Sequence, residues 1–223
     1  MRPPARLLQT QSNSCVPCVA TNVLYMFERV PEPNVQWVDQ QIGRKPGEFA
    51  ETASACLLWL QHKLKVHSIC GFNTKAYLDH GLDYLKQYYQ KEWTDGWDAF
   101  FTPNRVAQLQ EKRRQAHNQI SNFPSYSERL DIPTIDDIDA ALARKKIVCL
   151  CLNGDGTGNP SAHLTFIYGY RDGKYLMYIP SSQAMSDFTF VEIPHDGLAN
   201  PPKGTWLYFR PWLPKEGLVI VGE

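Results

Sequence analysis

The sequence has no excess of charge of either sign. Its 223 residues include 23 lysines and arginines and 23 aspartates and glutamates, so the formal net charge at pH 7 is zero. A balanced charge provides neither a general attraction to nucleic acid nor an acidic, solvated tail. We therefore expect no nucleic-acid partner and expect any partner to be recognised by local chemistry.

Long apolar segments are missing as well. No stretch approaches the roughly 18 consecutive apolar residues that a membrane helix needs. The two arginines near the N-terminus are not followed by the apolar segment of a signal peptide. These absences predict a soluble, cytoplasmic protein without a membrane span.

Cysteine is present but sparse. Six cysteines are spread over the chain, which is too few for a disulfide scaffold. With 43% hydrophobic residues, a chain of this length can bury a core of its own without such crosslinks. We therefore expect mostly reduced thiols and a single domain over residues 1–223.

Helical patterns fill the first third of the chain. Apolar residues recur at helical spacing after Cys15, and the pattern returns at 34–42 and 50–63, before a predicted strand at 65–69. We assign residues 1–70 to a helical lobe. The following segment, 71–131, is aromatic, charged and helical in places, and we interpret it as an insertion.

Strand patterns dominate the last third. A helix is predicted to start at Thr134, with Asp137 in the position of a capping box. The strands expected after it lie at 147–152, 163–170 and 174–179, with further apolar stretches at 188–193 and 206–209. Helices first and strands afterwards predict an α+β fold, with the N-terminal helical lobe packed against a C-terminal antiparallel β-sheet lobe, residues 132–223.

Cys15 lies where a polar turn opens into the first helix. Ser14 or Asn13 suits the N-cap of that helix, and Pro17 suits its first turn. The positive end of a helix and a nearby imidazolium both favour the thiolate, which is the reactive form of cysteine. Cys15 is therefore a candidate nucleophile.

His163 is the candidate base. It begins an apolar strand directly after a glycine-rich loop, at a lobe edge where a side chain can face a cleft. It follows Cys15 by 148 residues, which fits the order of papain-like proteins. A side-chain amide near the nucleophile can help to stabilise an oxyanion, and both Gln9 and Gln11 precede Cys15 closely.

Two motifs together resemble the peptidase C39-like family of the papain-like superfamily. The segment Gln9-x5-Cys15-Val16-Pro17 is similar to that family's Gln-x5-Cys-Gly-Pro opening. The strand from His163 to Tyr170 is similar to its second signature, a histidine and a strand ending in Gly-Tyr. The resemblance covers roughly residues 7–64 and 134–180. It implies a cleft between the two lobes, Cys15 as nucleophile, Gln9 as oxyanion donor, and no metal or organic cofactor.

The chain departs from the family pattern at two positions. Val16 replaces a glycine beside the nucleophile, which keeps the backbone amide and narrows the approach of a substrate. Ile179 stands where the family has an aspartate that orients the histidine. Ser181, Ser182 and Gln183, in the next turn, are possible substitutes for that aspartate.

Other kinds of site are disfavoured by what surrounds their motifs. Cys15 and Cys18 form a Cys-x-x-Cys, but neither a thioredoxin-like strand nor a second pair of metal ligands accompanies it. The glycine-rich segment 153–159 lacks the Gly-Lys-Ser/Thr ending of a phosphate loop and the spaced carboxylates of a calcium loop.

These observations predict a cysteine peptidase that cleaves a peptide or isopeptide amide of a peptide or protein substrate through a Cys-His thiolate-imidazolium pair and an acyl-enzyme. Two alternatives stay open. Because Ile179 cannot orient an imidazole, the chain could be a catalytically degenerate module that binds a peptide. The same residues could also serve an acyltransferase or an amidase.

Overall fold

The computed structural model describes residues 1–7, 9, 14–45, 48, 50–90, 95–153, 162–180, 189–198 and 217–223. Within these residues the chain is α+β, as the sequence predicts. The helices are α1 (Cys15–Met26), α2 (Val35–Gln41), α3 (Thr52–Gln61), α4 (Thr74–Tyr88), α5 (Asp95–Phe100), α6 (Pro103–Ile120), α7 (Ile135–Ala143) and the short 3-10 helix η2 (His195–Gly197).

The described strands form one mixed sheet in the order β2-β1-β7-β3-β4-β5-β6. Their bounds are β1 (Lys65–Ile69), β2 (Tyr126–Arg129), β3 (Ile147–Asn153), β4 (Ala162–Arg171), β5 (Lys174–Tyr178), β6 (Phe190–Pro194) and β7 (Leu218–Gly222). The hairpin between β4 and β5 turns at Asp172 and Gly173, which both have positive φ. This conformation matches the right-handed twist of the two strands.

The predicted C-terminal antiparallel sheet needs two corrections. β1 and β2 pair in parallel, because β2 closes the segment interpreted as an insertion and returns beside the first strand. β7 was not predicted from the sequence, yet it lies between β1 and β3 and pairs antiparallel with both. The strand from the first 70 residues thus shares a sheet with the strands of the last third.

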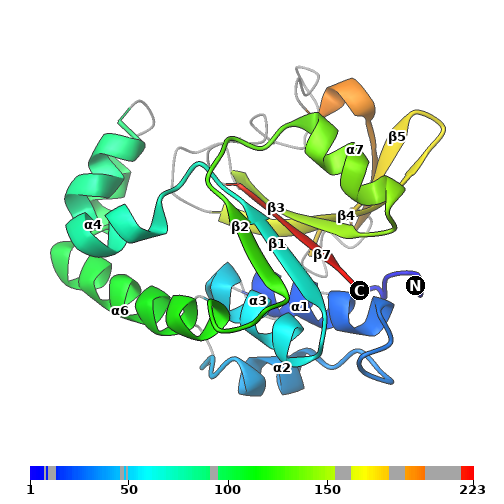
Figure 1. Cartoon of the computed structure of the whole chain (residues 1–223), viewed down its shortest axis with the longest axis horizontal. Coiled ribbons are helices and arrows are strands. Elements are labelled where there is room, and N and C mark those ends of the chain that lie inside the picture. Colours follow the sequence, from blue (N-terminus) through cyan, green and yellow to red (C-terminus); the bar gives the residue numbers. More distant parts are fainter. Residues whose placement is uncertain are drawn as a thin grey trace.

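Helices cover both faces of this sheet (Figure 1). α1 and α3 pack on one face, over a core that includes Val66, Phe166 and Val221 from the strands. α7 packs on the other face, over Val148 and Ile167. The alternation of these side chains along each strand is what places a core on each side. Among the described residues, no helix combines the length and apolar character that crossing a membrane requires.

α7 starts at the capping box that the sequence predicts. The Thr134 hydroxyl accepts a hydrogen bond from the Asp137 amide, and the Asp137 carboxylate accepts one from the Thr134 amide at 2.9 Å. Two backbone donors that the first turn of a helix leaves unpaired are satisfied in this way.

Replacing Thr134 by alanine is expected to lower the free energy of unfolding by about 1 kcal/mol, since the cap oxygen is lost. Thr134→Ser keeps that oxygen and is expected to stay near the original stability. Urea denaturation of the three proteins measures the difference. Equal loss in both variants would show that the hydroxyl is not what stabilises the start of α7.

The chain between β1 and β2 forms a helical arm at one side of the sheet (Figure 1). α6 packs on both α4 and α3. Arg113 of α6 lies over the rings of Phe72 and Tyr77, 5.2 and 5.7 Å from their centroids. It also pairs with Glu51, the N-cap residue of α3, at 3.3 Å. The ring contacts hold α6 against the start of α4 within the arm, and the pair with Glu51 joins the arm to α3.

One end of the sheet gathers segments that carry residues of the predicted site. β1 and β3 are parallel to each other, because both are antiparallel to β7. β4 begins where β3 ends, and β5 ends where β4 begins. The end of β1, where the helical arm starts, therefore lies at the same end of the sheet as His163 and Pro180.

Candidate active site

Cys15 is the first residue of α1 and is partly exposed. Ser14 occupies the N-cap position, although its side chain makes no capping hydrogen bond. α1 contacts β4, and the backbone of Leu164 forms a hydrogen bond with the Cys15 thiol. Since Leu164 directly follows His163, this contact brings the predicted nucleophile beside the strand residue next to the predicted base.

His163 lies at the start of β4, opposite Leu152 of β3, and its side chain is half-buried. Its Nε2 is 2.7 Å from the carbonyl oxygen of Pro180. A carbonyl oxygen can only accept, so Nε2 carries the hydrogen and the neutral ring keeps its lone pair on Nδ1. The backbone thus selects the tautomer in which Nδ1 is free to act as a base.

Pro180 supplies the orienting acceptor that Ile179 lacks. The Ile179 side chain is buried in the core beneath α7, and its amide donates to the Thr189 carbonyl at 2.9 Å. This bond holds the chain that presents the Pro180 carbonyl to His163. A carbonyl has no net charge, so it orients the imidazole without the electrostatic support that a carboxylate would give the imidazolium.

Gln9 has a buried amide nitrogen without a partner. Its Nε2 is shielded from solvent and forms no hydrogen bond within the part of the chain that the structure describes. Leaving such a donor unpaired costs roughly 1–3 kcal/mol. This donor can therefore form a hydrogen bond with an oxygen atom of a bound ligand.

The N-terminal segment runs along α1 toward Cys15. The Arg2 amide donates to the Met26 carbonyl and the Ala5 amide to Asn22 Oδ1, so the segment runs antiparallel to α1. From Asn22 to Cys15 the helix rises about 10 Å, and the four residues from Ala5 to Gln9 can span about 13 Å. The segment is therefore long enough to reach the start of the helix.

Tyr178 holds the middle of this segment. Its side chain is fully buried, and its hydroxyl donates to the Leu7 carbonyl at 2.7 Å. Tyr175, three residues earlier on β5, donates in the same way to Asp139 of α7 on the other face of the sheet. The two tyrosines form a matched pair, because only one of them contacts the segment that carries Gln9.

Tyr178→Phe and Tyr175→Phe are both expected to lower the stability by about 1–3 kcal/mol, since each removes the hydrogen bonds of a buried hydroxyl. Only Tyr178→Phe should speed amide exchange at Arg2 and Ala5, because only it frees the N-terminal segment. Hydrogen exchange followed by mass spectrometry makes the comparison. Equal exchange in the two variants would contradict the assigned role of Tyr178.

Burial determines the charge state of the Cys15 thiol and of the His163 imidazole in the resting protein. It raises the pKa of the Cys15 thiol, and the hydrogen bonds from Leu164, Val16 and Cys15 itself oppose it only in part. Burial also lowers the pKa of His163, more than the Pro180 carbonyl raises it. The expectation that the helix start lowers the thiol pKa is thus outweighed, and the resting pair is a neutral thiol and a neutral imidazole.

Arg44 adds a positive charge near the nucleophile. Its buried guanidinium pairs with Asp39 at 2.9 Å and donates through Nε to the Glu48 carbonyl at 2.8 Å. The positive charge lowers the pKa of the Cys15 thiol to a small extent. No sequence motif singles out Arg44, because its position depends on how α2 packs beneath α1.

Cys18 lies one turn along α1 and is fully buried. Burial, together with the neighbouring Cys15, raises the pKa of the Cys18 thiol to about 12. Such a thiol is an inert core residue at neutral pH. In the ranges that the structure describes, no three histidine, cysteine, aspartate or glutamate side chains are grouped as metal ligands.

Several predicted positions lie outside the described residues. These are Asn13, Gln11, most of the glycine-rich loop, and the possible orienting residues Ser181, Ser182 and Gln183. The Pro180 carbonyl was missed because a backbone oxygen leaves no signal in a sequence. The proline itself, which follows the predicted return strand, was the only indication of where the chain turns.

Comparison with protein-family models, with curated proteins and with solved structures finds no match to this chain. Its function must therefore be inferred from the fold and from the arrangement of side chains around Cys15.

Proposed function

We propose that this protein is a papain-like cysteine peptidase that resembles the C39-like family. The observation that supports the proposal is the hydrogen bond between the Cys15 thiol and the backbone of Leu164, the residue that follows His163, whose imidazole is oriented by Pro180. A nucleophile, an adjacent base and a group that orients the base are the recurring parts of a thiol hydrolase. In this proposal the helices over one sheet face and the strands beneath them correspond to the two lobes of the family, and the substrate would bind at the start of α1.

In the proposed reaction, His163 removes the Cys15 proton as the sulfur attacks the carbonyl carbon of a substrate amide. The oxyanion accepts hydrogen bonds from the Cys15 amide and from Gln9 Nε2, whose unpaired state in the resting protein supports this role. His163 then returns the proton to the leaving amine. Water hydrolyses the thioester, with His163 again as the base, and releases the acid.

The raised pKa of the Cys15 thiol favours base-assisted attack over a preformed ion pair. Proton transfer to His163 within the pair needs no net ionisation, since a thiol and an imidazole differ from a thiolate and an imidazolium only in where one proton lies.

A peptide library tests the proposal. Incubation with peptides derived from a cellular proteome, followed by mass spectrometry, should reveal new termini with the native protein and none with Cys15→Ala. Cys70→Ala is the matched control, because Cys70 is also partly exposed and its sulfur also accepts a backbone hydrogen bond, from Phe72 at 3.2 Å.

Termini that persist in Cys15→Ala would refute the assignment of the nucleophile. Absence of cleavage, together with a Cys15 thiol that reacts no faster than Cys70, would favour the peptide-binding module. That second candidate is supported by the uncharged Pro180 carbonyl, which stabilises an imidazolium less than a carboxylate does.

A further inference from the structure

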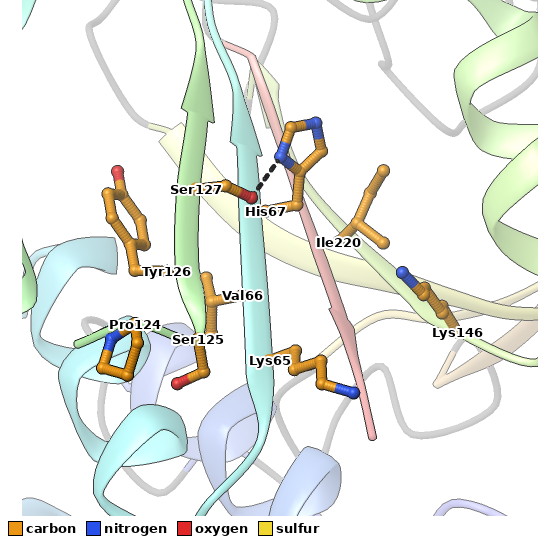
Figure 2. Close-up of a pocket in the computed structure, with 9 residues that line it drawn as sticks. All are labelled: Lys65, Val66, His67, Pro124, Ser125, Tyr126, Ser127, Lys146 and Ile220. Atoms are coloured by element: carbon orange, nitrogen blue, oxygen red, sulfur yellow. Dashed lines mark hydrogen bonds between the residues drawn. The ribbon is translucent and has the colours of Figure 1, made fainter.

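A hollow lies on the β1 side of the sheet, at the end opposite the candidate active site. Lys65 is the first residue of β1, whereas the site is at the end where β1 finishes. The hollow has a volume of about 220 Å³ and is lined in part by Lys65, His67, Ser125, Ser127, Lys146 and Ile220. Figure 2 shows Lys65 and Lys146 on either side of β7, with Ile220 and His67 beside them.

Gly222 allows the two lysines to converge. It pairs with Lys65 across β1 and β7, and a Cβ on Gly222 would lie only 2.9 Å from Cγ of Lys146. The missing side chain thus leaves room for the Lys146 side chain to lie across β7 beside Lys65. Two ammonium groups around one hollow repel each other unless an anion lies between them.

Two acidic groups nearby are paired elsewhere. Glu223, next to Gly222, pairs with Arg29 at 3.0 Å, and Asp137 pairs with Arg129 at 2.8 Å. Within the described residues, neither Lys65 nor Lys146 forms an ion pair, and no acidic residue lines the hollow. The positive charge of the hollow is therefore not neutralised by the described part of the protein.

The pKa of His67 responds to the charges around the hollow. Its Nδ1 is 2.8 Å from the Ser127 hydroxyl. Burial lowers the pKa of His67, the charges of Arg129 and Lys146 lower it further, and Ser127 and Asp137 only partly oppose them. Cations therefore act on His67 more strongly than the one nearby carboxylate.

We propose that this hollow binds a phosphate group. Its volume corresponds to about seven water molecules and is below the roughly 300 Å³ at which sites for drug-sized ligands begin. A single anionic group therefore fits better than a whole metabolite. Two lysines match a phosphate monoester, which carries a charge between about −1.5 and −2 at pH 7. The hydroxyl of Ser127, beside His67, is an additional polar group that can donate.

Phosphate titration of the full chain, followed by NMR of the histidine ring protons, tests the proposal. Inorganic phosphate at constant ionic strength should raise the pKa of His67 in a saturable way and leave the exposed His80 unchanged. Lys65→Gln/Lys146→Gln should weaken this response at least tenfold. Lys75→Gln/Lys145→Gln removes the same charge from exposed positions outside the hollow and should bind phosphate as the native protein does.

Three outcomes would overturn the proposal: no response of His67, the same response in both double variants, or an equal response to acetate. Lys65→Gln alone, at an exposed position, provides the test if the double variant does not fold. Titration with a phosphoserine peptide identifies the source of the group. Tighter binding of the peptide than of free phosphate would assign the hollow to a phosphorylated chain, and equal binding would assign it to the free ion. The site is remote from Cys15, so either result is independent of the proposed peptidase activity.

Discussion

Replacing His163 by alanine is expected to shift the alkylation of Cys15 to strongly alkaline pH. In the native protein the pKa of His163 is lowered from its ordinary value of about 6.5, so the imidazole is unprotonated at pH 7. His163 can therefore accept the thiol proton at neutral pH, and labelling should fall only as the pH drops through that lowered pKa. Without His163 the thiol must ionise alone, and burial raises its pKa above the ordinary value of about 8.5.

At pH 7 the expected loss of labelling rate in His163→Ala is about 10²- to 10⁴-fold, the usual contribution of a positioned general base. Iodoacetamide labelling at a series of pH values, read for each cysteine by mass spectrometry, measures it. Cys70 serves as the internal control in every sample and should keep its own pH profile. An unchanged Cys15 profile in His163→Ala would rule out the thiol and imidazole pair.

Gln9→Ala is expected to lower kcat by about 10²- to 10³-fold, which is the usual cost of removing one oxyanion donor. KM should change little, since the bond forms only as the negative charge develops on the substrate oxygen. The same substitution should leave the stability unchanged or slightly increased, because Gln9 Nε2 is buried without a partner in the resting protein, as far as the described residues extend.

This opposite effect on rate and stability separates a catalytic role from a structural one. The rate can be measured on a peptide cleaved in the library or, before one is known, on an activated aryl ester. Gln40→Ala, an exposed glutamine on α2, is the matched control and should change neither quantity. A stability loss of 2 kcal/mol or more in Gln9→Ala, taken as about the cost of a broken buried hydrogen bond, would show that Nε2 has a structural partner instead.

The elements with strong local signals could be predicted from the sequence. β1 was predicted with its observed bounds, and the helix from Cys15, the capping box at Thr134 and the hairpin at Asp172 were predicted within a few residues. In each case neighbouring residues contain the information, as a helical period, a cap or a turn residue.

The strands that were missed depend on distant partners. β2 has only four residues, three of them exposed, and forms because β1 provides its hydrogen bonds. β7 is a run of Leu, Val and Ile bounded by Gly217, so a signal existed. Its central position could not be read from that run, because pairing with β1 and β3 joins residues separated by about 70 to 150 positions.

For the candidate site, the sequence by itself determined the chemical groups: a thiol at the start of a helix, a histidine at the start of a strand and a glutamine ahead of both. Only the tertiary structure decided how they act. Packing of α1 against β4 brings the thiol to the residue beside His163, and the turn after β5 presents the Pro180 carbonyl to the imidazole. The same packing buries the pair and keeps it neutral. Local sequence sets which groups are available, whereas burial and long-range backbone contacts set their protonation and orientation, because both depend on residues far apart in the chain.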